Sequence, residues 1–272
     1  MIRTMTVTHE MLDAIVATAI GAGEKIMEVY RSDFAVEHKH DASPLTQADL
    51  AAHHHIVDAL RLLTPDIPVL SEEAADIPFA TRRQWTRYWL IDPLDGTKEF
   101  VRRNDEFTVN IALIERGIAR LGVVHAPALA RTWAAAAGHG AQCRDGGQHT
   151  AIRTRAVPAT PVYLVSKSHR NAALETLLAR APTHEARSRG SSLKFCEIAE
   201  GTADLHPRTG PTSEWDTAAG QCIVEQAGGV VLRTTDLQPL RYNEKESLLN
   251  PEFLVIGDPA YGWPRRLGIG AA

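Results

Sequence analysis

The sequence predicts an α/β (α+β) protein whose helices and strands stack in layers. Segments with apolar residues at helical spacing alternate with short apolar runs that are typical of strands. Turn-forming residues separate these segments. The chain has 272 residues, of which 44% are hydrophobic, enough for one large core or two modest ones. This alternation favours a layered architecture over a barrel or a helical bundle.

The N-terminal part should begin with an amphipathic helix, because apolar residues recur at helical spacing from Leu12 to Tyr30. A turn is expected at Asp41–Pro44. The segment Thr46–Asp49 resembles a capping box with Asp in place of Glu, and it predicts a second helix that ends before Pro65. Strands are then expected at Val69–Leu70, Tyr88–Ile91, Phe107–Ile114 and Arg120–His125.

The C-terminal part should follow Thr150–Pro161, a polar stretch that contains proline. We therefore divide the chain into a half of residues 1–155, with most of the candidate metal ligands, and a half of residues 156–272 that completes the site. In the second half we expect a strand at Val162–Val165, a helix at Asn171–Arg180, a helix from Asp216 to a stop signal at Gly228-Gly229, and a strand at Val230–Leu232.

The most specific signal lies where the apolar run Trp89-Leu90-Ile91 ends in Asp92-Pro93-Leu94-Asp95-Gly96. Proline fixes its own φ and glycine permits turns that other residues resist, so the chain should change direction here. Both carboxylates would then point at one place beyond the strand. Converging carboxylates repel each other unless a cation lies between them, and hard oxygen ligands favour Mg²⁺. Taken alone, the fragment could also be an acidic surface turn.

Two further acidic sites follow the same pattern. The run Val69-Leu70-Ser71-Glu72-Glu73 is short, apolar and ends in carboxylates. The segment Ser213–Gly220 places Asp216 at the expected N-cap of a helix. Asp216 alone would be interpreted as a cap. Three acidic sites at the ends of strands or helices, each beside apolar sequence, indicate one shared metal centre.

These motifs resemble those of the Mg²⁺-dependent, lithium-sensitive phosphatases related to inositol monophosphatase. The resemblance extends from about Met11 to Ile256 and implies an αβαβα layered sandwich of the inositol monophosphatase and fructose-1,6-bisphosphatase type, with the active site between its halves. It is greatest for the 3'(2'),5'-bisphosphate nucleotidase branch of CysQ type. The matching segments are Ser71–Glu73, Asp92–Phe100, Phe107–Leu113, Gly190–Cys196 and Trp215–Gly220.

The resemblance also implies roles for the motif residues. Thr97 and Asp49 would form a hydrogen-bonded pair that activates the nucleophilic water. Two or three Mg²⁺ ions would act as Lewis acids, with paired ions roughly 4 Å apart. The ligands of these ions would be four carboxylates and one backbone carbonyl, those of Glu72, Asp92, Asp95, Asp216 and Leu94.

Several of these residues have structural alternatives. Asp49 could be only an acid at a helix start, where the macrodipole stabilises it. Thr97 could be a helix N-cap, with or without a catalytic role. Glu73 is better interpreted as a neighbour of the ligands than as a ligand. The run His53-His54-His55 cannot face one ion, because consecutive helix positions point about 100° apart. We interpret it as surface sequence.

Substrate contacts rest on the resemblance alone. Hydroxyl and imidazole groups suit a purine or ribose edge, and Lys supplies a point charge for the phosphate that is not cleaved. Without the resemblance, the candidates outside the metal motifs are ordinary polar loop residues. The implied substrate-binding residues are Ser166, His169, Ser191 and Lys194, together with Glu72, Leu94, Asp95, Gly96, Thr97 and Asp216 of the metal motifs.

The composition argues against several classes of function. A net charge of −4 lacks the basic footprint of a general nucleic-acid binder. No segment approaches the ~20 apolar residues that span a bilayer, and the N-terminus lacks the apolar region of a secretory signal. Cys143, Cys196 and Cys222 show no CxxC spacing. We expect a cytoplasmic monomer or homodimer whose thiols are reduced. The protein could be peripheral to the inner membrane.

We therefore predict a Mg²⁺-dependent 3'(2'),5'-bisphosphate nucleotidase, a phosphoric monoester hydrolase. It would convert adenosine 3',5'-bisphosphate to AMP and phosphate, and so clear a by-product of sulfate assimilation. An inositol monophosphatase or a sugar bisphosphatase with the same chemistry is the first alternative. A non-catalytic nucleotide sensor is the second, which the presence of both Thr97 and Asp49 disfavours. Nothing in the sequence indicates the sugar cleft of a glycosidase.

Overall fold

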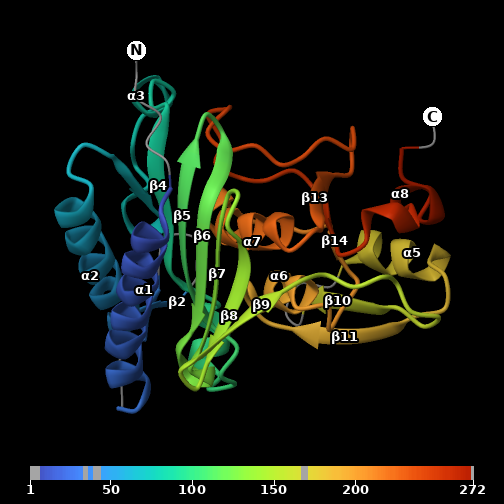
Figure 1. Cartoon of the computed structure of the whole chain (residues 1–272), viewed down its shortest axis with the longest axis horizontal. Coiled ribbons are helices and arrows are strands. Elements are labelled where there is room, and N and C mark those ends of the chain that lie inside the picture. The colour runs from blue at the N-terminus through green and yellow to red at the C-terminus, as the bar shows by residue number, and fades with distance from the viewer. Residues whose placement is uncertain (1–6, 33–35, 39–43, 167–170, 271–272) are drawn as a thin grey trace.

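Five layers of helices and sheets make up the protein, of which a computed structural model describes residues 7–32, 36–38, 44–166 and 171–270. This order of layers confirms the expected αβαβα sandwich. In Figure 1 the layers are α1 (His9–Tyr30) with α2 (Gln47–Leu63), a seven-stranded sheet, α6 (Leu193–Ala199) with α7 (Glu214–Gln226), a five-stranded sheet, and α5 (Ala172–Arg180) with α8 (Trp263–Arg266).

The first sheet is a meander that follows the chain order. Its first two strands are parallel, and each later strand runs antiparallel to the one before it. The order is β3 (Val69–Ser71), β4 (Arg87–Asp95), β5 (Thr108–Glu115), β6 (Ile118–Ala126), β7 (Arg131–Ala136), β8 (Gly140–Asp145) and β9 (Gln148–Ile152).

The second sheet mixes parallel and antiparallel pairs. Its order is β11 (Glu185–Arg189), β10 (Val162–Ser166), β12 (Leu205–Arg208), β14 (Phe253–Ile256) and β13 (Val230–Arg233), with β10 parallel to both of its neighbours. Short elements complete the described chain: the pair β1 (Val36–His38) and β2 (Pro44–Thr46), helices α3 (Phe79–Arg82) and α4 (Thr97–Val101), and the 3₁₀ turns η1 (Glu72–Ala74), η2 (Pro127–Leu129) and η3 (Pro259–Tyr261).

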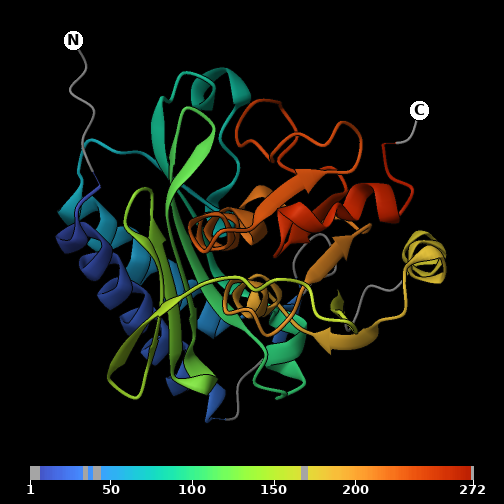
Figure 2. The same ribbon diagram turned by 45° about the vertical axis from the view of Figure 1, so that its right-hand side comes forward.

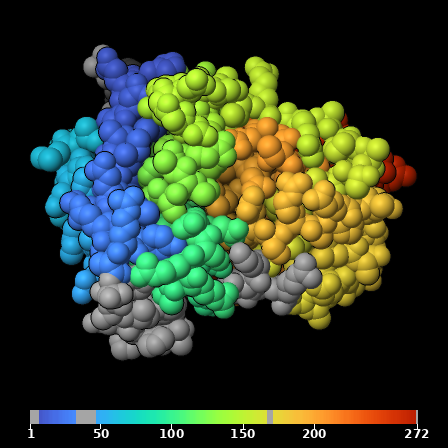
Figure 3. All heavy atoms as spheres, turned by 90° about the horizontal axis from the view of Figure 1, so that it is seen from below, coloured from blue at the N-terminus to red at the C-terminus, as the bar shows by residue number. Residues whose placement is uncertain are grey.

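Buried apolar side chains fill each space between layers. One cluster joins α1 and α2 to the first sheet, a second joins both sheets around α6 and α7, and a third joins the second sheet to α8. Figure 2 shows α7 between the sheets, and Figure 3 shows the N-terminal helices and the C-terminal segments at opposite ends of the molecule. The division into residues 1–155 and 156–272 stays a prediction.

Helix α7 lies directly on the first sheet because glycine faces it there. A Cβ atom on Gly122 of β6 would lie 2.4 Å from the carbonyl oxygen of Ala219, closer than atoms can approach. On the other side of α7, a Cβ on Gly220 would lie 2.5 Å from the ring of Phe195 in α6. These contacts determine how close the N-terminus of α7 comes to the end of β4.

Most of the predicted elements are confirmed, with ends that shift by four residues or fewer. The polar stretch Thr150–Pro161, where we placed the boundary between the halves, begins inside β9, which extends to Ile152. The side chain of Thr46 and the turn residues 41–43 lie outside the described part, so that the capping box and most of the turn stay predictions. No helix in the described ranges is both long enough and apolar enough to cross a membrane.

Candidate metal centre and substrate cavity

Three carboxylates meet where β4 ends and α7 begins. Asp92, Asp95 and Asp216 each offer an oxygen, and these oxygens all lie within 4.8 Å of one another. Asp92 is 1% exposed, so water screens little of its charge. The structure thus brings together three of the four carboxylates that the sequence predicted to be ligands.

Strand β4 delivers two of these carboxylates through an irregularity in its pairing. Its register with β5 shifts between Asp92 and Asp95, as in a β-bulge, and bulges re-aim side chains. The backbone N–H of Leu94 donates to Asp92 Oδ1 at 3.1 Å. The strand continues through Pro93 to Asp95, and the expected change of direction occurs at Gly96, whose φ is +89°. That left-handed value favours glycine.

The position of Asp216 differs from the prediction. The N-cap of α7 is Ser213, and Asp216 lies three residues later. Its Oδ2 accepts a hydrogen bond from the backbone N–H of Ser213 at 2.8 Å, as the acid of a capping box does. The N-cap assignment was therefore wrong, because Ser213 supplies the cap. The reciprocal bond anchors the carboxylate while one of its oxygens joins the acidic cluster.

Asp95 is held by two serines of the loop between β11 and α6. Its Oδ2 accepts hydrogen bonds from the Ser191 hydroxyl at 2.6 Å and the Ser192 hydroxyl at 3.0 Å. Thr108 Oγ1 lies 2.5 Å from Ser191 Oγ, and Asn110 Nδ2 donates to Ser192 Oγ at 2.9 Å. This buried network links β5 to the loop before α6. Sequence reasoning missed Thr108 and Asn110 as parts of the site, although both lie in the matching segment Phe107–Leu113.

Electrostatics make the cluster costly without a cation. Burial, together with the charges of Asp95 and Glu72, raises the pKa of Asp216 to about 8. Burial also raises the pKa of Asp92 well above its usual range, as do the charges of Glu72, Asp95, Asp216 and Asp49. Glu72, in η1, and Asp49, in the first turn of α2, therefore lie near enough to act on the cluster.

A cavity of about 310 Å³ opens beside this cluster, between the two sheets. Its wall includes the turn from Asp95 to Glu99, the loop from Gly190 to Ser192, and the start of α7. The predicted substrate residues Ser166, Ser191 and Lys194 also line it. His169 lies outside the described residues, so that its predicted contact is not tested.

Two buried cations lie in the cavity wall, Lys194 and Arg208. Burial lowers the pKa of Lys194 to about 8, and it also lowers the pKa of Arg208. Sequence reasoning missed Arg208, and also His206 of the same strand. His206 Nδ1 lies 2.8 Å from the carbonyl oxygen of Leu164, which only accepts, so Nδ1 carries the proton. The pKa of His206 is well below its usual value because of burial, so the ring is neutral.

The remaining predicted residues are placed as follows. The Thr97 hydroxyl donates to the carbonyl oxygen of Leu94 at 3.3 Å, and Gly96, not Thr97, is the N-cap of α4. Asp49 is fully buried. Of the three consecutive histidines, His54 is exposed, and His53 Nδ1 lies 2.8 Å from Ser71 Oγ, at the start of η1.

The chain matches the model of the Inositol monophosphatase family over residues 8–255. The chain belongs to the inositol monophosphatase family. It is 50% identical to the 3'(2'),5'-bisphosphate nucleotidase CysQ of Escherichia coli O6:H1 over 248 residues, which cover 90% of this chain and 99% of that protein. It is 36% identical to the protein of that name from Aggregatibacter actinomycetemcomitans, with 95% and 97% covered.

The crystal structure of CysQ from Bacteroides thetaiotaomicron, described as a bacterial member of the inositol monophosphatase family, has a similar fold. It matches with a TM-score of 0.80 and 39% identity, and covers 90% of this chain and 97% of that one. This family consists of metal-dependent phosphatases, and the donor set fits a metal. Buried carboxylate oxygens are the ligands that hard divalent cations prefer.

The acidic cluster predicts a pH-dependent stability. Because the pKa of Asp216 rises from 3.8 to about 8 on folding, the folded state keeps a proton that the unfolded state loses. Between about pH 4 and pH 8, metal-free protein should therefore lose stability as the pH rises. A divalent cation must displace this proton, so the increase in Tm caused by Mg²⁺ should be larger at pH 8 than at pH 5. Differential scanning calorimetry with and without chelator measures this difference.

The matched variant is Asp216→Asn, which removes a titrating carboxylate. It should reduce both the decrease in Tm with pH and the pH dependence of the Mg²⁺ effect. An equal Mg²⁺ effect at both pH values in the wild-type protein would contradict a proton-holding metal centre.

Proposed function

We propose that this protein is a Mg²⁺-dependent 3'(2'),5'-bisphosphate nucleotidase that hydrolyses the 3'-phosphate of adenosine 3',5'-bisphosphate to give AMP and phosphate. The observation that carries the proposal is the acidic cluster beside a cavity with two buried cations. One end of such a site suits a phosphoryl group held through metal ions, and the other suits a second phosphate. The 50% identity to a nucleotidase of this specificity supports the same substrate.

The proposed ligands are one backbone carbonyl and four carboxylates, which would hold two or three Mg²⁺ ions. When bound, these ions supply Lewis-acid chemistry at the phosphoryl group and lower the pKa of water. The capping box of α7 and the serine hydroxyls on Asp95 keep two of the carboxylates in place. The full set is Glu72, Asp92, Leu94, Asp95 and Asp216.

Thr97 and Asp49 are proposed to orient the attacking water. The Thr97 hydroxyl donates to the carbonyl oxygen of Leu94, so the lone pairs of Thr97 Oγ1 can accept a hydrogen bond from water. Asp49 acts on Asp92 through its charge, which supports a place near the same water. The water oxygen bonds to phosphorus as the bond from phosphorus to the ribose 3'-oxygen breaks, and that oxygen leaves as a hydroxyl with the proton that the water gives up.

The nucleotide is proposed to occupy the cavity. Lys194 and Arg208 would pair with the phosphate that is not cleaved, since buried charges need such partners. Neutral His206 lies near enough to both cations for their charges to lower its pKa, and it contributes its ring to the wall. Ser166, Ser191 and Gly96 also lie in the wall, and His169 is included by resemblance only.

We also propose a metabolic role, a location and an oligomeric state for the protein. A role in sulfate assimilation would follow from the substrate. Cys143, Cys196 and Cys222 are all buried and free of disulfide bonds, which is consistent with a cytoplasmic protein. The protein would act as a monomer or homodimer, without nucleic acid as a partner, and could be peripheral to the inner membrane.

Phosphate release from a substrate panel tests this function. The panel is adenosine 3',5'-bisphosphate, inositol monophosphate and fructose bisphosphate, each with and without Mg²⁺. We expect kcat/KM to be highest for the nucleotide and activity to disappear with chelator. Li⁺ in the millimolar range should inhibit, as in the lithium-sensitive relatives. Preference for either of the other substrates would replace the nucleotide assignment, whereas binding of the nucleotide without turnover would indicate a sensor.

Lys194→Met tests the contact with the second phosphate. A hydrogen bond to a charged group contributes on the order of 1.5–3 kcal/mol, so KM for adenosine 3',5'-bisphosphate should rise roughly ten- to a hundredfold. KM for 3'-AMP, which has no second phosphate, should change little, and kcat should be largely kept.

The control for this variant is Lys25→Met, since Lys25 is an exposed residue of α1 that pairs with Glu28. Because Lys194 Nζ also donates to backbone carbonyls, the Tm of each variant is measured first. Equal KM values for Lys194→Met and wild type on the bisphosphate would contradict the nucleotide pocket and leave the metal centre intact.

A further inference from the structure

The loop from Gly190 to Ser192 connects the metal centre to the substrate cavity. It joins β11 to α6, and the hydroxyls of Ser191 and Ser192 bind Asp95. Ser191 has a φ of +49°, a left-handed backbone conformation that residues other than glycine rarely adopt. Something outside the loop must therefore keep it in this shape.

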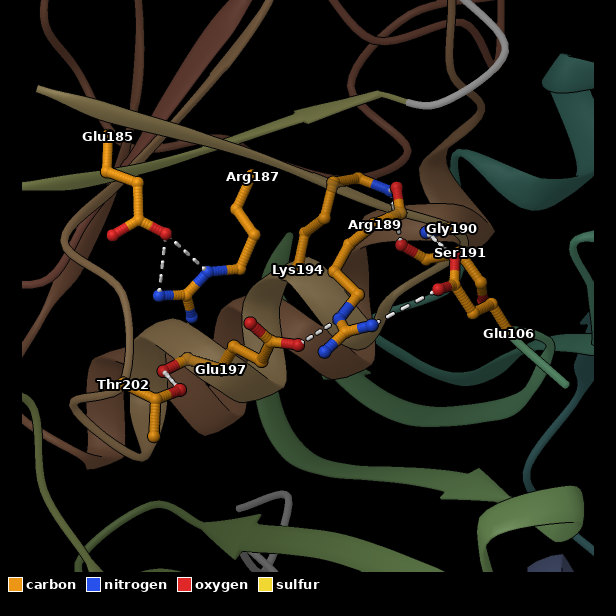
Figure 4. Close-up of polar contacts among 9 residues, drawn as sticks. All are labelled: Glu106, Glu185, Arg187, Arg189, Gly190, Ser191, Lys194, Glu197 and Thr202. Carbon is orange, nitrogen blue, oxygen red and sulfur yellow. Dashed lines mark hydrogen bonds and ion pairs between the residues drawn. The ribbon is translucent and has the colours of Figure 1, made fainter. Parts of the chain in front are cut away.

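Glu106 holds the start of this loop through two consecutive residues. Its Oε2 accepts the backbone N–H of Gly190 at 2.8 Å, and its Oε1 accepts Arg189 Nη1 at 3.2 Å. The Nε of the same guanidinium donates to Glu197 Oε1 of α6. Figure 4 shows Arg189 between the two carboxylates. We call Glu106, Arg189 and Glu197 the Glu106 clamp.

The two carboxylates of the clamp are shielded, and Glu106 is tightly packed. The side chains of Glu106 and Glu197 are 14% and 15% exposed, so the ion pairs are only partly screened by water. A Cβ on Gly190 would lie 2.9 Å from both the Cβ and the carbonyl oxygen of Glu106. A Cβ on Gly96 would lie 3.1 Å from that carbonyl oxygen. Glu106 thus lies between the turn that follows Asp95 and the loop that binds Asp95.

Lys194 holds the loop from within the cavity. Its Nζ donates to the carbonyl oxygens of Arg189 at 3.3 Å and Ser191 at 2.5 Å. These carbonyls lie on either side of Gly190, whose N–H binds Glu106. A movement of Gly190 would therefore displace both the Lys194 ammonium and the Ser191 hydroxyl.

We propose that Glu106 is a positioning residue for the reaction, which acts through the Gly190–Ser192 loop on both Asp95 and Lys194. The cavity wall in the described chain contains Ser191 and Lys194 but not Glu106, so Glu106 acts through others. The inference rests on the proposed function where it concerns substrate. The part of the inference that concerns the loop and Mg²⁺ binding rests only on the contacts of Glu106, Arg189 and Lys194 described above.

The chain offers a matched control for this proposal. Glu185 lies on the same strand as Arg189 and forms a similar pair with Arg187, with 3.1 Å between Glu185 Oε1 and Arg187 Nη2. Figure 4 shows this pair away from the loop. Glu185→Ala removes one carboxylate and one arginine pair, as Glu106→Ala does, without a contact to Gly190 or Ser191.

The experiment compares wild type, Glu106→Ala, Glu106→Gln and Glu185→Ala. In Glu106→Ala we expect hydrogen exchange at the Gly190 amide to become faster by tenfold or more. This is the order of change expected in the opening equilibrium when one hydrogen bond to a charged group is lost. Mg²⁺ affinity by calorimetry should fall, and KM for adenosine 3',5'-bisphosphate should rise roughly tenfold. Glu106→Gln keeps one acceptor and should lie between Glu106→Ala and wild type. Glu185→Ala should match wild type in every readout.

A double-mutant cycle separates positioning from a general loss of stability. In a Ser191→Ala background, Glu106→Ala should cost less Mg²⁺ affinity than it does in wild type, because one of the loop's two hydroxyl links to Asp95 is already absent. Additive losses would overturn the proposal, as would unchanged exchange and Mg²⁺ affinity in Glu106→Ala, or a decrease in kcat alone. If wild type released no phosphate from the nucleotide, the proposed function would fail, and exchange and Mg²⁺ affinity would still decide the role of Glu106.

Discussion

Repulsion among buried carboxylates is the constraint on which the site depends. Asp92, Asp95 and Asp216 converge within 4.8 Å, and two of them hold raised pKa values because burial disfavours their charge. The donors that anchor them are backbone N–H groups and serine hydroxyls, which orient a carboxylate without cancelling its charge. The fold thus keeps the carboxylates together and leaves their charge for a divalent cation to neutralise.

The layered fold makes this convergence possible. Gly122 lets α7 lie against β6, so that the first turn of α7 reaches the end of β4. The loop that binds Asp95 follows β11, the edge strand of the second sheet. The cavity therefore takes its acidic side from the first sheet and helix α7, and its cations from helix α6 and the second sheet. A site of this composition requires both sheets.

The sequence predicted the parts of the site that lie in short contiguous motifs. Asp92 and Asp95 are three positions apart at the end of an apolar strand, and Asp216 begins an apolar helix, so local pattern was enough. The N-cap assignment was wrong because Ser213-Glu214-Trp215-Asp216 is itself a capping-box pattern, with the serine as cap.

Other parts could not be predicted because they depend on tertiary packing. Arg208 and His206 lie on β12, a four-residue strand with two charged or polar residues and a proline, which carries no strand signal. Strands β9 and β11 are edge strands with largely polar, solvent-exposed sequences, so apolar periodicity did not reveal them. The contacts of Glu106 join residues 83 and 84 positions apart, beyond the range of any local pattern.

Calorimetric titration of metal-free protein with Mg²⁺ near neutral pH, in two buffers of different ionisation enthalpy, tests the central claim most directly. The buffer dependence reports how many protons leave when the cation binds. We expect wild type to bind Mg²⁺ with proton release, and Asp95→Asn to bind it at least tenfold more weakly, since this variant lacks one anionic ligand. Absence of Mg²⁺ binding by wild type, or equally tight binding by Asp95→Asn without proton release, would contradict the account.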